Sequence, residues 1–329
     1  SQKNTVPNSV TAPSWCSSAL LLVFHHPCLY NIYMNEHDKV FKEIQSVREN
    51  ALDFIRGTVP EELLCLLNLD TLSLEKDSFI DPDLGEHFSD LIYSCQTAHQ
   101  HKLKITLLLE HKSQKPANEH LQLLRYLINI WSHETKNHQP LSLIIPIIFY
   151  HGDSTWEARL FTERFANYAP ALLRFIPEIP YLLTDLQRYD DEAIKRTLFH
   201  RDINATMALL MKYIRNSTLL PDKLAEIFIP VKQRFSHETI PAEVSSLIYY
   251  LLKISELDIA RITQIISTID PKGGEAIMTT ATKLREEGKI EGKIETARRM
   301  LGDGQSIELI AKYTGLSLSE IMALQDNQS

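Results

Sequence analysis

The stretch Ile105–Ser113, with the sequence ITLLLEHKS, decides the fold that this chain is expected to adopt. Five apolar or β-branched residues run directly into four polar ones, which is typical of a buried strand whose end reaches a site. Because alternate residues of a strand share a face, Glu110 and Lys112 are expected on one face and His111 on the other. A carboxylate beside an ammonium can hold a metal ion and a water near a phosphate. An edge strand that ends in an ordinary surface ion pair is the alternative.

The segments around this stretch predict an α/β sandwich built on a mixed sheet. Apolar residues with helical spacing predict one helix from His37 to Arg56, closed by Gly57, and a second from Asn118 to His133. Three strands in a meander, a crossover helix and a strand buried on both faces form such a sheet. The strands are expected at Leu69–Leu74, Ser89–Cys95, Leu103–Lys112 and Leu141–Tyr150, where Pro146 indicates a bulge or an edge.

After Gly152 the pattern changes to a helical region. Pro170, Pro177 and Pro180 interrupt a connecting segment, and no cluster of chemically active residues stands out beyond it. Helices are expected at Ala205–Tyr213, Leu224–Phe228, Val244–Ile254 and Ile259–Ile269.

The composition excludes several classes of protein. The chain has 329 residues, of which 44% are hydrophobic and 23% charged, so packed domains are expected rather than disorder. With a net charge of −8, any nucleic-acid surface must be a local basic patch. The four cysteines form no CxxC pair, which fits a reducing, cytoplasmic location without a disulfide framework. The apolar run Ala19–Phe24 is too short to cross a membrane, and no membrane association is expected.

The constellation around the deciding stretch predicts a metal site. Asp90 opens the second expected strand, one hairpin away from Glu110 and Lys112. Facing residues of antiparallel strands lie about 5 Å apart, so Asp90 and Glu110 can share an ion. Mg²⁺ prefers oxygen ligands and keeps several waters, so two carboxylates and a backbone carbonyl suffice to bind it. Lys112 would polarise a water or contact a phosphate.

With these residues the chain resembles the PD-(D/E)XK nucleases, and within them the Rpn group of recombination-promoting nucleases, also described as PD-(D/E)XK nuclease family transposases. Asp90 followed by Glu110-x-Lys112 matches the PD-(D/E)XK signature, and Gln122-Leu-Leu-Arg-Tyr126 resembles the Gln-x-x-x-Tyr motif of the RecB-like branch. The resemblance is good from Met34 to Ile214, and the tail from Glu286 to Leu324 is similar as well. The motifs that resemble the Rpn group are His37-Asp38-x-x-Phe41-Lys42, Leu69-Asp70-x-Leu72, Ser89-Asp90-Leu-Ile-Tyr93, Leu109-Glu110-His111-Lys112-Ser113, Arg125-Tyr126 and Pro146-x-x-Phe149-Tyr150-His151-Gly152.

This resemblance implies a restriction-endonuclease-like fold and a DNA endonuclease that depends on Mg²⁺ or another divalent cation and acts in recombination or mobile-element biology. Asp90 and Glu110 would be the metal ligands, and Lys112 would contact the water or the phosphate. Many members of the group carry Gln at the position of Lys112, whereas Lys matches the wider superfamily. A domain that keeps this fold but binds DNA or a partner without cutting is the alternative.

The resemblance also implies residues that support the substrate. Gln122 and Tyr126 would lie on the substrate side of the site. Asp38 would correspond to the acidic residue on the first helix of the RecB-like branch, unless it is only a carboxylate in the first turn of a helix. His37 and His111, which flank catalytic candidates, are expected to be structural hydrogen bonders rather than bases. The histidines at positions 99 and 101 are expected at a solvated hairpin tip rather than in a metal site.

The C-terminal segment from Glu275 to Gln325 is expected to be an autonomous helical appendage. Interleaved charges predict a solvated helix from Ala281 to Met300, in which Gly288-x-x-x-Gly292 suits the close approach of a second helix. Ser306–Tyr313 and Ser317–Leu324 predict two short helices with serine N-caps. Helix, turn and helix form the outline of a helix-turn-helix. DNA binding, partner docking and self-association through these helices are all open.

The patterns divide the chain into four parts. Residues 1–33 lack periodicity and are expected to be an extension outside the folded domain, with a genuine N-terminal arm as the alternative. Residues 34–152 are expected to form the nuclease core, and residues 153–270 a helical region that completes it or packs on it. Residues 271–329 would be the helical tail.

Overall fold

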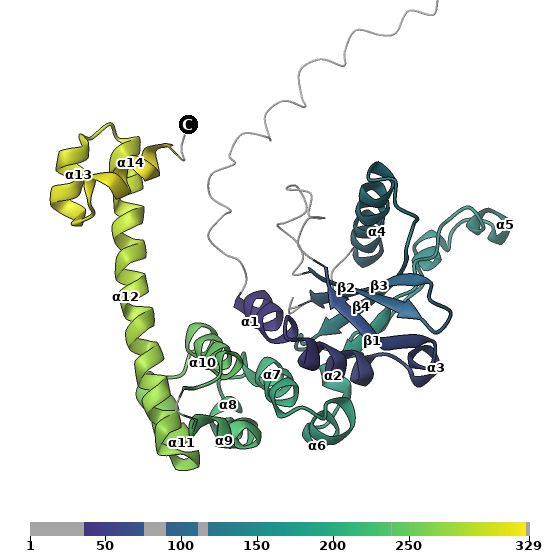
Figure 1. The fold of residues 1–329 in the computed structure, drawn as a ribbon, viewed down its shortest axis with the longest axis horizontal. Coiled ribbons are helices and arrows are strands. Elements are labelled where there is room, and N and C mark those ends of the chain that lie inside the picture. The colour runs from purple at the N-terminus through teal and green to yellow at the C-terminus, as the bar shows by residue number, and fades with distance from the viewer. Residues whose placement is uncertain (1–35, 76–89, 111–117, 238, 327–329) are drawn as a thin grey trace, which may run out of the picture. The chain divides into compact units, whose positions relative to one another are not determined.

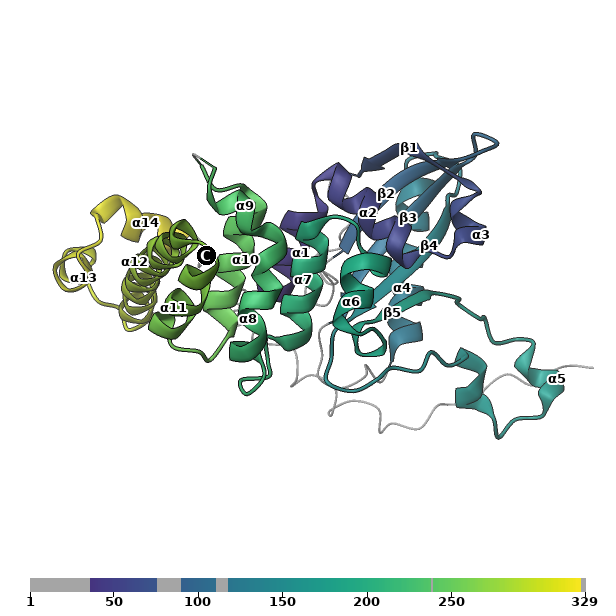
Figure 2. The ribbon, with the colours of Figure 1, turned by 90° about the horizontal axis from the view of Figure 1, so that it is seen from below.

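The computed structural model describes residues 36–75, 90–110, 118–237 and 239–326. Five strands form one mixed sheet in the order β1-β2-β3-β4-β5 (Figures 1 and 2). β1 with β2 and β2 with β3 pair antiparallel, whereas β3 with β4 and β4 with β5 pair parallel. The predicted α/β architecture with a mixed sheet is therefore confirmed. The strands are β1 (Leu67–Leu74), β2 (Asp90–Thr97), β3 (Lys102–Glu110), β4 (Leu143–Tyr150) and β5 (Leu182–Asp185).

One face of the sheet is covered by α4 (Glu119–Lys136) (Figure 1). Alternate residues of β4 go to opposite faces, as the period of a strand requires. Ile148 packs with Leu123 and Ile130 of α4, whereas its neighbours Ile147 and Phe149 pack on the other side. α4 crosses from the end of β3 to β4 and so makes the parallel connection predicted from the sequence.

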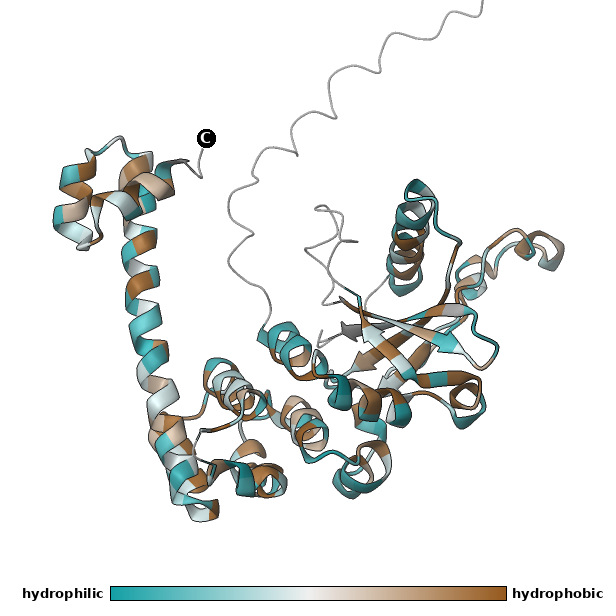
Figure 3. Ribbon diagram, viewed as in Figure 1, coloured by the Kyte–Doolittle hydropathy of each residue, from teal (hydrophilic) through white to brown (hydrophobic). Residues whose placement is uncertain are grey.

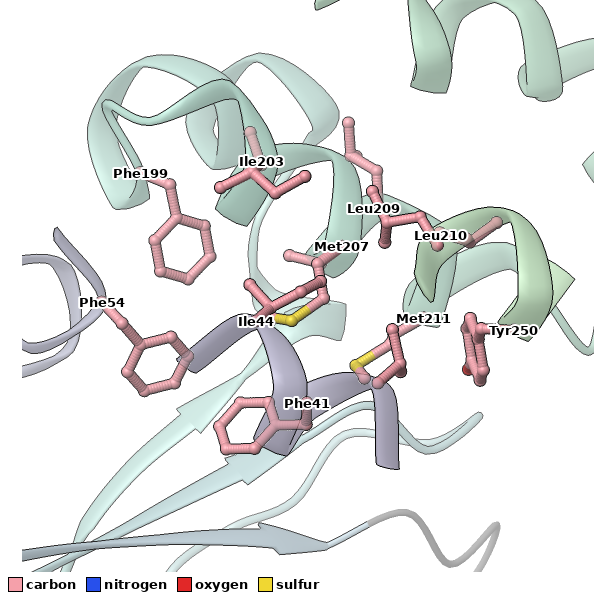
Figure 4. Packing of buried hydrophobic residues seen from close by; sticks show 14 of the residues in the cluster. Phe41, Ile44, Phe54, Phe199, Ile203, Met207, Leu209, Leu210, Met211 and Tyr250 are labelled. Atoms are coloured by element: carbon pink, nitrogen blue, oxygen red, sulfur yellow. The ribbon is translucent and has the colours of Figure 1, made fainter. Parts of the chain in front are cut away.

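The opposite face is covered by α1 (Glu36–Gln45), α2 (Arg48–Thr58) and α7 (Asp202–Tyr213). Phe41 of α1 stacks on Phe149 of β4, with ring centroids 5.7 Å apart, and Phe54 of α2 stacks on Phe199 at 5.5 Å. Figure 4 shows Phe41, Phe54 and Phe199 in one cluster with Met207 and Met211 of α7. The main core therefore joins segments that are far apart in the sequence.

The single helix expected from His37 to Arg56 is two helices. α1 ends at Gln45 and α2 begins at Arg48. At the break, the Ile44 carbonyl accepts the side-chain amide of Asn50 at 2.9 Å and the backbone N–H of Val47 at 3.4 Å. Gly57 does not close the helix but lies inside α2. A Cβ atom there would stand 1.8 Å from the Leu198 carbonyl oxygen, so Gly57 permits a close approach of two backbones.

The strand β5 was not predicted from the sequence. It has four residues and follows Pro177 and Pro180, which made this segment look like a loop. β5 pairs with β4 only from Ile147 onward, so Pro146, which pairs with Thr106 of β3, lies just before the part of β4 that pairs with β5. β4 is thus an inner strand of the sheet, and the missing N–H of Pro146 falls where β5 offers no partner.

The predicted helical region after β5 is confirmed. α8 (Leu220–Phe228), α10 (Ala242–Ile254) and α11 (Ile259–Ile269) extend the main core, and α7 lies beside α1 (Figure 2). The shorter elements are α3 (Glu61–Leu64), η1 (Phe161–Phe165), α5 (Pro170–Leu173), η2 (Leu186–Arg188), α6 (Asp191–Ala193), η3 (Ile194–Leu198), η4 (Ile229–Val231) and α9 (Lys232–Phe235).

The tail consists of α12 (Pro271–Gly302), α13 (Ile307–Thr314) and α14 (Leu318–Asp326). α12 starts ten residues earlier than predicted, and its first turns belong to the main core, where Ile277 is fully buried. Residues 285–293 are exposed on every side, and Figure 3 shows this part of the helix as largely hydrophilic. The end of α12 packs with α13 and α14 around Ala297, Ile310 and Ile321. No helix among the described residues is long and apolar enough to cross a bilayer.

Candidate active site

One edge of the sheet collects the ends of four strands. β2 begins there with Asp90, and β3 and β4 end there with Glu110 and Tyr150. In the antiparallel register Asp90 pairs with Leu108, two residues before Glu110. In the parallel register Glu110 pairs with Tyr150, which in turn pairs with Asp185 at the end of β5. The backbone therefore brings Asp90 and Glu110 to neighbouring positions at this edge.

The structure describes the backbone at Asp90 and Glu110, whereas His111 and Lys112 lie outside the described residues. The first 33 residues of the chain lie outside them as well. Among the described residues, no three His, Cys, Asp or Glu side chains gather as the ligands of one ion. The oxygen donors of two carboxylate residues at adjacent strand ends suit a hard cation such as Mg²⁺.

α4 brings Gln122 and Tyr126 to the same side of the sheet as the end of β4. Tyr126 is 8% exposed and belongs to one buried cluster with Tyr150, whose backbone pairs with Glu110. Within the described part of the chain, neither the buried Oε1 of Gln122 nor the hydroxyl of Tyr150 has a hydrogen-bond partner. Buried polar atoms are normally paired, so these two are candidates for contact with a ligand.

A buried pair of histidines joins α1 to the same edge. The rings of His37 and His151 lie 4.9 Å apart, and His151 directly follows Tyr150. Both rings are almost fully buried, at 5% and 2% exposure. Asp38 is the next residue of α1, in its acidic first turn, and its Oδ1 is buried. The packing of His37 on His151 therefore brings the α1 backbone that carries Asp38 to this edge.

Two residues of the helical region hold His37 in place. The hydroxyl of Tyr250 lies 2.6 Å from Nδ1 of His37, and Nη2 of Arg215 lies 3.4 Å from Nε2. Arginine can only donate, so Nε2 must accept, and the proton of a neutral ring is then on Nδ1, which donates to Tyr250. Burial raises the pKa of Tyr250 well above its usual value, so the hydroxyl stays protonated. The expectation that His37 is a structural hydrogen bonder agrees with these contacts.

Sequence reasoning missed Arg215 and Tyr250. They lie 178 and 213 residues after His37 and belong to a region in which no chemical cluster had been expected. A tyrosine and an arginine in a helical pattern carry no local signal, so only the fold could identify them. The histidines at positions 99 and 101, by contrast, are exposed at the β2–β3 hairpin, as expected.

Comparisons with known proteins show which family the sequence resembles. A family model described as "Putative transposase, YhgA-like" matches residues 35–239. An "inactive recombination-promoting nuclease-like protein", RpnE of Escherichia coli, is 31% identical over 301 residues, which are 87% of this chain and 96% of the relative. The recombination-promoting nucleases RpnA and RpnC of Escherichia coli are 29% and 30% identical, each over 87% of this chain and 96% and 95% of their own lengths. No solved structure matches the chain.

Proposed function

The chain belongs to the YhgA-like transposase family, and from this premise we propose that it is a Mg²⁺-dependent DNA endonuclease that acts in recombination or mobile-element biology. The observation that carries the proposal is the strand register, which places Asp90 and Glu110 at one edge of the sheet. Two relatives that match over nearly their full length are named recombination-promoting nucleases, which supports the same proposal.

The proposed roles follow from the chemistry of phosphodiester hydrolysis. A bound Mg²⁺ supplies an activated water and neutralises the charge that develops on the phosphate. Asp90 and Glu110 would hold the ion, with the backbone carbonyl of position 111 as a further oxygen donor. Lys112 would contact the water or a phosphate oxygen, and Gln122, Tyr126 and Asp38 would support the substrate side of the edge.

A non-cutting module is the second candidate, because RpnE is named an inactive nuclease-like protein. A chain of this kind would keep the fold and bind DNA or a partner. The sequence of this chain favours cutting, since Asp90, Glu110 and Lys112 are all present.

The two candidates differ in one experiment. Supercoiled plasmid is incubated with the wild-type protein in Mg²⁺, with wild type in EDTA, and with Glu110→Ala in Mg²⁺. We expect nicked or linear plasmid only in the first reaction. Lys112→Gln should lose less cutting activity than Lys112→Ala. Cutting by purified Glu110→Ala at the wild-type rate would refute the assigned centre. Binding of the plasmid without cutting by the wild type would support the non-cutting module.

We further propose that the tail mediates self-association rather than base reading. α14 carries no Lys or Arg, although base and phosphate contacts depend on cations. In the exposed middle of α12, Gly288 and Gly292 share one face, and a Cβ atom at either would meet open space. The helical period places a row of cations on one flank of this face and a row of anions on the other. A parallel pairing of two copies would set the cations of one against the anions of the other. The rows are Arg285, Lys289 and Lys293, and Glu287, Glu291 and Glu295.

A further inference from the structure

A polar cavity of about 390 Å³ opens beside the edge that holds the candidate site. Its walls come from the end of α7, from the turn between α7 and α8, and from the segments that follow β4 and β5. Neither the sequence reasoning nor the relatives assign a role to this cavity. It is lined by Asp153, Gln187, Lys212, Tyr213, Arg215, Asn216, Ser217 and Leu219.

Two residues that line the cavity lie close in sequence to the strand ends at the candidate site. Asp153 lies two residues after His151, which packs on His37. Gln187 follows β5 and donates its side-chain amide to the Gly152 carbonyl at 3.0 Å. The cavity thus lies at the carboxyl ends of the parallel strands β4 and β5, the position at which α/β sheets usually bind ligands.

Arg215 is oriented before any ligand arrives. Its Nη2 contacts Nε2 of His37 at 3.4 Å, and Tyr250 fixes the other nitrogen of that ring at 2.6 Å. A guanidinium held in this way loses little further freedom when it binds an anion, and its planar donors match the oxygens of a phosphate.

Lys212 is held on the same wall. Its Nζ lies 2.8 Å from the Tyr189 carbonyl and 3.0 Å from Asp191 Oδ1, while Lys223 and the Tyr213 hydroxyl bind the same carboxylate. Burial raises the pKa of Asp191, but the hydrogen bonds from Lys223, Tyr213 and Lys212 outweigh it and lower the pKa to about 2. Asp191 therefore stays ionised and fixes the Lys212 ammonium in position.

Neutral donors complete the wall. Asn216 accepts the backbone N–H of Leu219 at 2.9 Å through its Oδ1, which leaves its Nδ2 as a donor. Ser217, the next residue in the exposed turn, also lines the cavity. Two cations, four neutral polar side chains and one carboxylate, that of Asp153, thus line the cavity.

We propose that this cavity is a phosphate-binding subsite, and that it takes a backbone phosphate of the DNA strand that runs to the sheet edge. The proposal rests on the proposed function, because it assumes DNA as the ligand. The shared chemistry is a phosphate group, so a free nucleotide is the competing source. The subsite would position the strand without reading its sequence.

The decisive variant is Asn216→Asp. Its Oδ1 can still accept from Leu219, so the turn is preserved, while a negative charge enters the cavity. Binding of a fluorescein-labelled 20-bp duplex is measured by anisotropy in EDTA, across a series of KCl concentrations, so that cleavage plays no part. We expect Asn216→Asp to weaken binding about tenfold. The slope of log K against log salt is negative, and it should become less steep by about 0.9 because one phosphate contact is lost. Arg215→Lys keeps the charge but loses the planar donors, and should also weaken binding.

Matched controls make the same changes far from the cavity. Gln264→Glu and Arg261→Lys are exposed positions on α11 and should leave duplex binding within about twofold of wild type. A thermal midpoint close to wild type verifies that each variant is folded. If Asn216→Asp binds the duplex as Gln264→Glu does, the cavity is refuted as a subsite for DNA.

Two further outcomes separate the possible failures. If millimolar AMP raises the thermal midpoint of wild type but not of Asn216→Asp, while duplex binding is equal in both, the cavity takes a free nucleotide and the DNA assignment is refuted. If the protein binds duplex through this cavity but never cuts plasmid, the subsite stands and the endonuclease proposal fails.

Discussion

The sheet region and the tail are stabilised over different distances along the sequence. In the sheet region, Gln45 of α1 donates to Asn204 of α7 at 2.8 Å across 159 residues, and Tyr250 reaches His37 across 213. In the tail, Ala297, Ile310 and Ile321 pack within 25 residues of one another. The sheet region should therefore lose stability as a whole when one contact is removed, whereas damage to the tail should stay local.

Polar contacts show the same difference. Asp53 of α2 accepts the backbone N–H groups of His200 and Arg201 and the side chain of Asn204, so one carboxylate fixes the start of α7. In the tail, Ser317 and Glu320 cap their own helix in a capping box, and Gly315 ends α13 with a φ of 69°. The first kind of contact positions the site, and the second only shapes a helix end.

The largest expected effect comes from a glycine in the sheet region. Gly57→Ala would place a Cβ atom 1.8 Å from the Leu198 carbonyl oxygen, and backbone must move to make room. We expect a loss of about 3 kcal/mol or more in the free energy of unfolding, or failure to fold. Urea denaturation followed by circular dichroism measures it. Gly288→Ala is the matched control in the tail and should not destabilise, because its Cβ would meet open space. A stable Gly57→Ala would mean that α2 and η3 are not packed as described.

The next effect comes from the carboxylate that joins α2 to α7. Asp53→Ala leaves two backbone N–H groups without their side-chain acceptor and removes one of the two acceptors of the Asn204 amide, and should cost about 3 kcal/mol by urea denaturation. Ser317→Ala removes a cap in the tail and should cost about 1 kcal/mol, confined to α13 and α14. Hydrogen exchange should show faster exchange throughout α1, α2 and α7 in the first variant and only in α13 and α14 in the second. If both variants lost the same stability and exchanged faster only near the substituted residue, the difference between the sheet region and the tail would be contradicted.

A smaller effect should appear on acidification. Burial raises the pKa of Glu134, but hydrogen bonds from Ser142 and the 2.9 Å pair with buried Lys104 outweigh it, so the pKa is lowered from 4.5. A carboxyl whose pKa is lowered by folding stabilises the protein at pH values above about 4.5. This contribution is lost as the pH falls through the pKa of the folded state. The urea concentration at the unfolding midpoint should thus decrease once the pH drops below about 4.5. In Glu134→Gln this decrease should be smaller, and the free energy of unfolding at pH 7 should be lower than in wild type.

The exposed loop variant Glu256→Gln serves as the control for acidification and should leave the pH profile as it is in wild type. In the tail, hydrogen bonds from Ser317 lower the pKa of Glu320, but that carboxyl is exposed. Acid should therefore weaken only its own capping box. A pH profile of Glu134→Gln that coincides with wild type would show that the buried pair does not govern the acid response.

The smallest effect on stability is expected in the middle of α12. Replacing Gly288 and Gly292 together by Ala should raise helix stability by about 1 kcal/mol for each residue, seen as higher helicity. The same change should lower the mass measured by light scattering, because bulk on the glycine face keeps a second copy away. Truncation after Arg285 should bring the mass down to that of a single shortened chain and leave the main core intact. If both variants still have the mass of more than one copy of their own chain, self-association through this face is excluded.

The expectation that the tail is autonomous from Glu275 is wrong, because the first turns of α12 belong to the main core. Ile277 is part of the main core, and Gly273 lies close enough to Ile266 that an added Cβ would stand 2.8 Å from its side chain. Deletion from Glu275 would therefore expose core residues. The periodic pattern of α12 runs through both parts without a break, so the sequence did not mark this boundary.

The sequence alone determined the features that depend on neighbouring residues. Alternation and apolar runs predicted β1 to β4 near their observed positions, and serine caps with a glycine turn predicted α13 and α14. Local patterns report local geometry, because a helix or strand repeats its face every few residues. β5 was missed because four residues after two prolines are too few to show a period, and the break at Val47 was missed because the apolar spacing continues across it.

Only the tertiary structure decided what surrounds the candidate site. The deciding stretch and the motif of Asp90 with Glu110 could be named from the sequence, since hairpin and crossover rules make β2, β3 and β4 neighbours, whereas the pairing of Asp90 with Leu108 came from the structure. The contacts of His37 with Arg215 and Tyr250, and the cavity that Arg215 lines with Lys212, could not be. These residues meet because α1, α7 and α10 pack on one another in a shared core, and a contact across some 200 residues leaves no pattern in the chain between them.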